Sequence, residues 1–438
     1  MTSGARHAIN ADSVARHLLA NGATLLVYPN PASPSVAIGA YHAAGAVLET
    51  REHAGLASLT ADALNRGTAN RTFLEFSEEL DQVGASLAFH ADTEYAALGG
   101  RALAEDLDLL LTLATDVLEQ PTFPDDEVGR VREQTLTVLA HADDNPGSRA
   151  ARRFRELLYG GSNPNGWPED GYAETVCEFQ ADDLRAFHAR AYSPASLVLA
   201  VVGAVDPPAV RDLVERTIGA WHASPDAATA ADWRTALDVA DAPPAALAEP
   251  RREDLTIEGK TQTEFLLGWL GIRRTDPSYH ATIVANFILG QLGLGGRIGS
   301  NVRDTQGLAY HASSYAVPGL TRQPWSIRAG INPANVDRAI EASLHEARQL
   351  AEAPPDAEEL QLSKQALIGS LPLRLERNDG IANMLLTMER YGLGLDHLGA
   401  YPGLIDSVSA DDVREVTAAV MSDPAYTLVT AGPQLPNG

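Results

Sequence analysis

Histidine is the residue type in this sequence best suited to metal chemistry, and the chain has twelve of them. The motifs H-E-x-x-H and H-x-x-E-H place two imidazoles one helical turn apart, beside a glutamate that can act as a general base. Neither motif occurs in the sequence. His53 follows Glu52, for example, but no second ligand stands four residues further on. The histidines are therefore predicted to be surface or hydrogen-bonded residues rather than metal ligands.

Two other patterns give weaker chemical signals. Cys177 is the only cysteine, which excludes an intrachain disulfide, and its acidic neighbours predict an unreactive, half-buried thiol. The segment Gly293–Gly299 follows a helical pattern and contains G-x-G-x-x-x-G, so it differs from a dinucleotide-binding loop in spacing and in context. It is either a flexible turn between helices or a backbone surface that a polypeptide can approach closely, because glycine leaves room.

The charge of the chain limits its partners. Lys and Arg total 33 against 58 Asp and Glu, a formal net charge of −25. Such an acidic chain is a poor candidate for binding nucleic acid or an anionic membrane surface. The acidity indicates either a well-solvated surface or an acidic chamber that attracts basic substrates. No run of apolar residues is long enough for a membrane span or a signal peptide, so a cytoplasmic location is expected.

The elements that must position any site form two related halves. The Ala/Pro-rich segment 222–250 predicts a semi-extended linker between domains 1–221 and 251–438. A helix beginning near Asp182 ends at Ser193-Pro194 before the apolar run 197–203, and a helix beginning near Asp411 ends at Asp423-Pro424 before 426–432. Each half also opens with a strand-like run, 24–41 or 261–270, followed by a helical pattern, 53–66 or 279–291. We predict an α+β fold of two homologous halves, each a mainly antiparallel sheet packed with helices.

The segment Gly55–Thr68 carries a family resemblance. Its residues, GLASLTADALNRGT, resemble the active-site helix of the inverzincin metallopeptidases, which include pitrilysin and the mitochondrial processing peptidase and read G-L-A-H-x-x-E-H-x-L-x-x-G-T there. Further similar segments follow in order over essentially the whole chain: 74–85, 121–123, 159–166, 182–203 and 303–315. The resemblance implies that the two halves form half of a clamshell chamber.

This chain departs from the family at every position of the zinc site. Ser58 and Asp62 stand where the family has its two histidines, Ala61 stands at the general base, and Val138 stands at the second glutamate. Serine and valine do not supply the ligands that zinc prefers, and alanine cannot activate water. No metal or other cofactor is therefore expected in this chain, which is not expected to be an active peptidase alone.

Arg303 and Tyr310 match a second family segment, RDTQGLAY. In active relatives, the corresponding arginine and tyrosine reach the substrate at the zinc. A guanidinium offers fixed donors to peptide carbonyls, and a phenol can stabilise the oxyanion that develops as water attacks. Without the resemblance, the residues themselves would favour a surface arginine and a half-buried strand tyrosine, because the segment crosses from a helix end into a strand.

The resemblance implies a non-catalytic subunit of a heterodimeric zinc endopeptidase. A homologous partner with an intact H-x-x-E-H would supply zinc and the general base, and this chain would contribute Arg303 and Tyr310. Substrates would be extended peptides, basic ones if the net charge selects them. Two alternatives stay open: a structural subunit of a larger complex with this fold, and a peptide-binding homodimer without catalysis.

Overall fold

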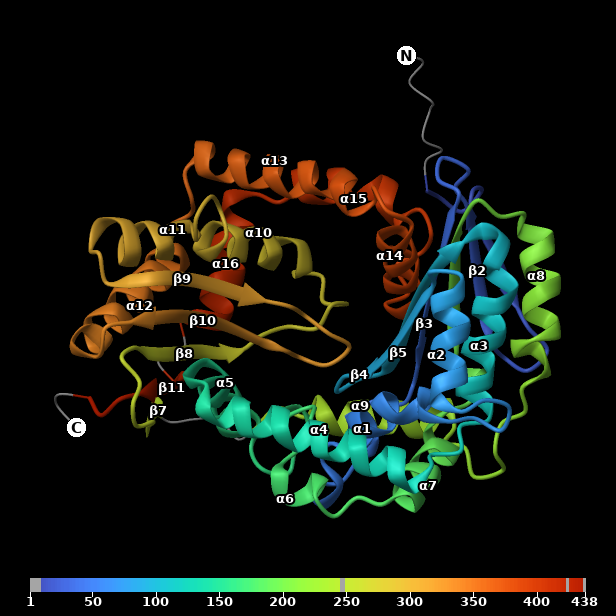
Figure 1. Cartoon of the computed structure of the whole chain (residues 1–438). Coiled ribbons are helices and arrows are strands. Elements are labelled where there is room, and N and C mark those ends of the chain that lie inside the picture. Colours follow the sequence, from blue (N-terminus) through green and yellow to red (C-terminus); the bar gives the residue numbers. More distant parts are fainter. Residues whose placement is uncertain (1–8, 245–248, 423–424, 436–438) are drawn as a thin grey trace. The chain divides into compact units, whose positions relative to one another are not determined.

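The computed structural model describes residues 9–244, 249–422 and 425–435. The chain folds into two compact units of α+β architecture (Figure 1). Unit 1 comprises the described residues up to Thr137, together with Pro168–Leu237 and Pro372–Ala400. Unit 2 comprises Val138–Trp167, Asp238–Leu371 and the described residues from Tyr401 onward. None of the helices in these ranges is long and apolar enough to cross a membrane.

A six-stranded sheet forms the centre of unit 1, in the order β1-β2-β6-β3-β5-β4. The pair β2–β6 is parallel and the other pairs are antiparallel. Every residue of β6 is buried, as its continuous apolar sequence predicts. The strands are β1 (Ala15–Leu18), β2 (Thr24–Pro29), β3 (Ser35–His42), β4 (Ser86–Ala91), β5 (Ala96–Leu103) and β6 (Val198–Gly203).

Unit 2 repeats this topology with five strands, in the order β7-β11-β8-β10-β9. Its one parallel pair, β7–β11, corresponds to β2–β6, and antiparallel pairs follow in the same succession. The predicted α+β class and the two homologous halves are therefore confirmed. The strands are β7 (Arg251–Thr256), β8 (Thr263–Leu270), β9 (Ala309–Ala316), β10 (Pro324–Ile331) and β11 (Thr427–Gly432).

Helices pack on both sheets. Those within unit 1 are α1 (Leu56–Ala63), α2 (Phe73–Gln82), α3 (Leu107–Glu119), α6 (Ala173–Val176), α7 (Ala181–Ala191), α8 (Pro207–Arg216) and α14 (Asn378–Arg390). Those within unit 2 are α5 (Pro146–Tyr159), α10 (Tyr279–Gly290), α11 (Gly296–Ile298), a π-helix (Gly299–Thr305), α12 (Val336–Glu352) and α16 (Ala410–Met421). Four more helices cross the unit boundaries: α4 (Asp125–Asp144), α9 (Ala230–Ala240), α13 (Ala357–Arg374) and α15 (His397–Asp406).

Each half of the sequence lends one helix to the other unit. Helix α5 comes from the first half but packs on β8 and β11, where Phe154 and Leu158 join Val429 and Ala431 in a buried cluster. Helix α14 comes from the second half but packs on β3 and β6. The compact units thus differ from the continuous ranges 1–221 and 251–438. The reason is that each sheet has a second apolar face, and the helix that covers it lies in the other half of the sequence.

Local signals set most helix starts. Ser409 and Asp412 form a reciprocal capping box at the start of α16, and at α7 the Asp183 carboxylate accepts the N–H of Gln180. The run 24–41 forms two strands, β2 and β3, instead of one. The segment 222–250 contains α9, so its described part is not simply extended. The proposed break at Asp423-Pro424 lies outside the described residues.

The packing of α5 on the sheet of unit 2 makes a testable prediction. Phe154→Ala should lower the free energy of unfolding by about 3–5 kcal/mol, because a fully buried aromatic side chain is lost from the cluster with β11. Amide exchange should quicken in β11, which lies far from residue 154 in the sequence. Leu74→Ala, at an exposed position, is the control and should change neither stability nor exchange. Unchanged protection of the β11 amides in Phe154→Ala would contradict the packing of α5 on this strand.

Candidate functional site

Helix α1 lies in the segment that resembles the active-site helix of the inverzincin family. It begins after Gly55, whose φ of 98° favours glycine. The buried carboxylate of Glu49 accepts the N–H groups of Gly55 (3.1 Å) and Ala57 (2.5 Å), so it satisfies the free donors at the helix start. Burial raises the pKa of Glu49 to about 8, against the opposing effect of these hydrogen bonds.

The side chains along α1 do not form a zinc site. The Ser58 hydroxyl donates to Asp170 Oδ1 at 3.1 Å, and Ala61 is buried. Asp62 stays accessible to solvent. Partial burial and the charge of Asp170 raise its pKa to about 6. Zinc prefers imidazole, thiolate and carboxylate ligands in a set of three or four, and one carboxylate with a serine does not fit that requirement.

The fourth family position does not add a ligand. Val138 lies on α4 and is 55% exposed. Among the residues that the structure describes, no group of three or more histidine, cysteine, aspartate or glutamate side chains is arranged to hold a metal ion.

Arg303 lies on the π-helix of unit 2. Such segments are rare and are frequently found at functional sites. The segment is tied to the long helix α12 because Asn301 Nδ2 donates to Glu346 Oε1 at 2.6 Å, and Gln306 Nε2 donates to Asn301 Oδ1 at 2.7 Å. Just before the π-helix, Arg297 makes a two-point ion pair with Glu359 of α13, at 2.8 and 2.5 Å.

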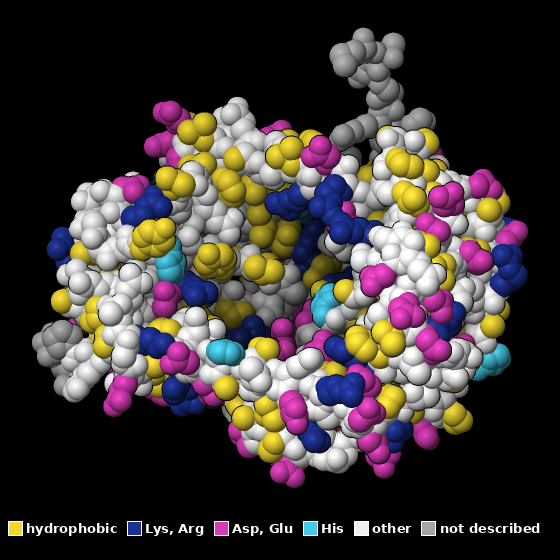
Figure 2. Space-filling view, viewed as in Figure 1, with side chains coloured by type: hydrophobic (Ala, Val, Ile, Leu, Met, Phe, Trp, Pro, Cys, Tyr) yellow, Lys and Arg dark blue, Asp and Glu magenta, His cyan; other side chains and the backbone are white. Residues whose placement is uncertain are grey.

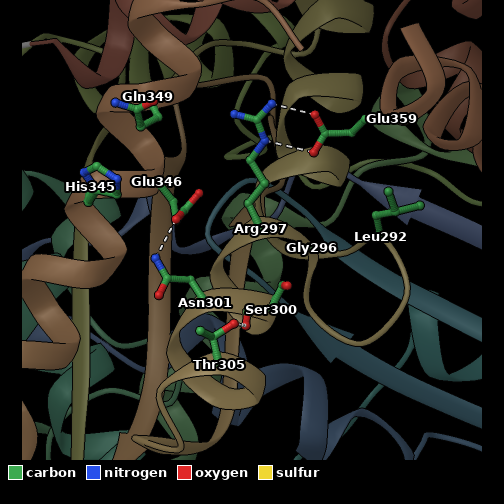
Figure 3. Close-up of a pocket in the computed structure, with 10 residues that line it drawn as sticks. All are labelled: Leu292, Gly296, Arg297, Ser300, Asn301, Thr305, His345, Glu346, Gln349 and Glu359. Carbon is green, nitrogen blue, oxygen red and sulfur yellow. Dashed lines mark hydrogen bonds and ion pairs between the residues drawn. The ribbon is translucent and has the colours of Figure 1, made fainter. Parts of the chain in front are cut away.

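The Asn301–Glu346 hydrogen bond and the Arg297–Glu359 ion pair border a cavity of about 740 Å³. His345 and Gln349 of α12 also line it. Figure 3 shows that Arg297 reaches toward Glu359 and Asn301 toward Glu346. The cavity therefore marks where the π-helix is held against α12 and α13.

The guanidinium of Arg303 is already paired. Its Nε lies 2.8 Å from Asp304 Oδ1, and its Nη2 lies 3.1 Å from Oδ2. This carboxylate occupies two donors that a peptide carbonyl would otherwise use. The pair lies at the surface, where such interactions contribute little to stability and are readily exchanged.

Tyr310 lies at a bulge in β9. Gly307, with φ of 63°, turns the chain from the π-helix into this strand. Ala309 pairs with Ile331 and His311 with Gly330, so Tyr310 is an extra residue without a cross-strand partner. A bulge re-aims a side chain, and the Tyr310 side chain is 86% exposed, unlike the buried Ala312 and Ser314 further along β9. No described contact joins Arg303 to Tyr310, and their roles stay predictions.

The glycine-rich segment is approached by this chain's own strand. A Cβ on Gly290 would collide with the backbone of Ser314, and one on Gly295 would meet the Ala312 carbonyl. Gln291 Nε2 also donates to the Ser314 carbonyl at 3.3 Å. The end of α10 and Gly295 thus lie against β9, which leaves no room for a side chain at positions 290 and 295.

The corresponding edge of unit 1 is open. Within the described part of the chain, the backbone groups of β4 pair with β5 and with no other segment. An unpaired strand edge can accept an extended polypeptide. Sequence reasoning did not single out β4, because its position at the edge depends on the order of the strands.

The remaining candidate, Cys177, is exposed and not half-buried as predicted. Its pKa is raised by slight desolvation and by the neighbouring Glu178 carboxylate. A raised pKa lowers the fraction of reactive thiolate, as expected from its acidic neighbours.

The raised pKa of Asp62 makes a second testable prediction. The folded state holds the Asp62 proton up to about pH 6, whereas the unfolded chain releases it near its usual value of 3.8, so stability falls as pH rises between these values. Asp62→Asn should therefore raise the free energy of unfolding at pH 7.5 by about 1 kcal/mol, after allowance for solvent screening.

Thermal unfolding at pH 7.5 and pH 4 tests this expectation. The gain should shrink at pH 4, where Asp62 is protonated in the folded protein. Asp226→Asn, at an exposed turn position, is the control. Equal effects of the two substitutions at both pH values would contradict the prediction.

Comparison with known proteins agrees with this geometry. Residues 25–161 match the family described as insulinase (peptidase family M16), and residues 178–367 match the peptidase M16 inactive domain. The chain is 28% identical over 418 residues to an uncharacterized zinc protease of Streptomyces coelicolor, covering 93% of this chain and 87% of that protein. It is 26% identical over 364 residues to the uncharacterized zinc protease YmxG of Bacillus subtilis, covering 83% and 85%.

Solved structures show the same fold. A peptidase M16 inactive domain from Pseudomonas fluorescens superposes with a TM-score of 0.87 at 26% identity, covering 96% of this chain and 98% of that one. The periplasmic protease PqqL of Escherichia coli gives 0.79 at 15% identity, and the match spans 99% of this chain but 47% of PqqL. The chain belongs to peptidase family M16, as a member in which the zinc ligands and the general base are replaced.

Proposed function

We propose that this protein is the non-catalytic subunit of a zinc endopeptidase and acts with a homologous partner that carries an intact H-x-x-E-H. The observation that carries the proposal is the contrast between the two candidate sites. Helix α1 lacks a zinc donor set, whereas Tyr310 is held on a bulge with its side chain 86% exposed. Bulges are over-represented next to active sites, where they re-aim a side chain, and the position of Tyr310 on one supports the proposal.

In this proposal, the partner supplies the zinc-activated water, and this chain binds the peptide. The Arg303 guanidinium donates to a substrate carbonyl and fixes its position. The Tyr310 phenol donates to the carbonyl oxygen of the bond to be cleaved, and this hydrogen bond strengthens as negative charge develops there. The ties from Asn301 to α12 and from Arg297 to α13 hold the π-helix that carries Arg303.

In the unbound protein, the Asp304 carboxylate accepts the hydrogen bonds of Arg303 that the substrate would otherwise accept. It satisfies the guanidinium of Arg303 until a peptide carbonyl or carboxylate replaces it. The exchange costs little because both side chains reach solvent.

A second candidate function is peptide binding without catalysis, by this chain alone or as a homodimer. The open edge of β4 favours it, because an extended peptide could add there by backbone pairing. This function predicts peptide affinity that does not depend on Arg303 or Tyr310.

Reconstitution with the H-x-x-E-H partner tests the proposed function. The pair should cleave peptides much faster than the partner alone, and Tyr310→Phe should lower kcat by about 100-fold through the loss of one oxyanion donor. Arg303→Ala should mainly raise KM. The matched controls are Tyr426→Phe, just before β11, and Arg414→Ala, on α16, and both should leave these constants unchanged. Full activity of the partner alone, or of Tyr310→Phe, would refute the proposal.

The role of Asp304 gives a separate prediction. Asp304→Asn should free the guanidinium of Arg303 and lower KM about two- to fivefold with little change in kcat. The effect should vanish in an Arg303→Ala background, which a double-mutant cycle in the reconstituted pair would measure. An equal effect in both backgrounds would show that Asp304 does not act through Arg303.

A further inference from the structure

Part of one face of the unit 2 sheet is left uncovered by helices. Helix α5 packs on β8 and β11. Beyond it, the same face of β9 and β10 presents His311, Ser313, Ser326 and Arg328, all of intermediate exposure. Figure 2 shows basic, acidic and histidine side chains close together over β9 and β10. This uncovered area is called the β9–β10 face below.

Arg328 is central to the β9–β10 face. Its side chain is 43% exposed, and its Nε lies 3.4 Å from Glu264 Oε2 on β8. The other four N–H donors of the guanidinium have no hydrogen-bond partner within the described part of the protein. Gly147 at the start of α5 leaves room for the guanidinium, since a Cβ there would collide with Nη2.

The surroundings of Arg328 leave space for a ligand. Ser313 lies opposite it on β9, and Ser326 and Gly330 lie two residues away on either side along β10. Ser313 and Ser326 border the guanidinium with small side chains, whereas Glu264 and His311 lie over Gly330. Among the residues that the structure describes, Glu264 is the one carboxylate in contact with Arg328, and it is shared with His311, whose Nε2 lies 3.4 Å from Glu264 Oε2.

We propose that the β9–β10 face is a specificity subsite for the carboxylate of an acidic residue in an extended peptide, with Arg328 as the recognising group. A carboxylate can accept from the donors of this guanidinium that Glu264 and Gly147 leave open, through the two-point hydrogen bonding for which arginine is best suited. The hydroxyls of Ser313 and Ser326 can donate to the neighbouring peptide backbone.

The register of the sheet places this subsite along the substrate, a step that rests on the proposed function. His311 follows Tyr310 and pairs with Gly330, and Arg328 lies two residues from Gly330. Two residues of a strand span about 7 Å, and an extended peptide also advances by about 7 Å over two residues. The acidic side chain is therefore expected about two residues from the carbonyl that meets Tyr310.

The proposal separates local recognition from the net charge of −25. Long-range attraction by an acidic protein favours basic peptides and weakens with salt over about 10 Å. A carboxylate in direct contact with Arg328 depends on a short-range, two-point hydrogen bond, which salt screens less. An acidic residue at one position is thus compatible with basic residues elsewhere in the same peptide.

Peptide binding to the full chain tests the subsite directly. The probes are three short fluorescein-labelled peptides that differ at one position, which holds aspartate, asparagine or lysine. Fluorescence anisotropy should give the aspartate peptide about tenfold tighter binding than the asparagine peptide. Arg328→Gln should abolish this preference, and Arg328→Lys should keep only part of it, because lysine retains the charge without the fork. Arg414→Gln is the matched control and should keep the full preference.

Equal affinity for the aspartate and asparagine peptides would overturn the subsite, and so would a preference that survives in Arg328→Gln. If Arg328→Gln does not fold, as judged by circular dichroism, the wild-type peptide series and Arg328→Lys still decide. Failure of the proposed function would appear instead as absent turnover in the reconstituted pair. That result leaves the binding preference of this chain unaffected, so the two failures are distinguishable.

Discussion

Burial of the second face of each sheet is the constraint on which the rest of this structure depends. A sheet that is apolar on both faces needs two covering layers. In unit 1, the second cover includes α14, and Leu386 of that helix packs close to Gly39 of β3. In unit 2, it includes α5, whose Phe154 is buried against β11. Because each cover comes from the opposite half of the sequence, neither half can complete its own core.

The same constraint determines what is left exposed. Helix α5 packs on β8 and β11, and its first turn reaches the Arg328 guanidinium, so Arg328 of β10 and His311 of β9 remain partly exposed. The bulge at the start of β9 turns Tyr310 out of the core. The side chains that a peptide could reach in unit 2 therefore lie at the bulge in β9 and on the strands beyond α5.

Helix α1 retains its packing and its N-terminal hydrogen bonds although its side chains are not a set of zinc ligands. Glu49 still holds the N–H groups of Gly55 and Ala57, so the helix start is kept in place. Ser58 and Asp62 now stand at the ligand positions, and the Ser58 hydroxyl is engaged by Asp170. The fold needs this helix for packing, because Leu59 and Ala63 are buried, whereas nothing in the packing requires imidazole at 58 and 62.

The sequence by itself determined the α+β class, the repeat, the family and the replacement of the zinc donors. These follow from local spacing: acidic residues start α7 and α16, and Ser58, Ala61 and Asp62 occupy a recognisable frame. Only the tertiary structure decided that α5 and α14 change units, that Asp304 pairs with Arg303, and that Arg328 lies exposed beside Glu264. The exchange and the Arg328 surroundings depend on strand order, register and long-range packing, while the Asp304 pair depends on side-chain geometry within the π-helix. None of these is encoded in the spacing of neighbouring residues.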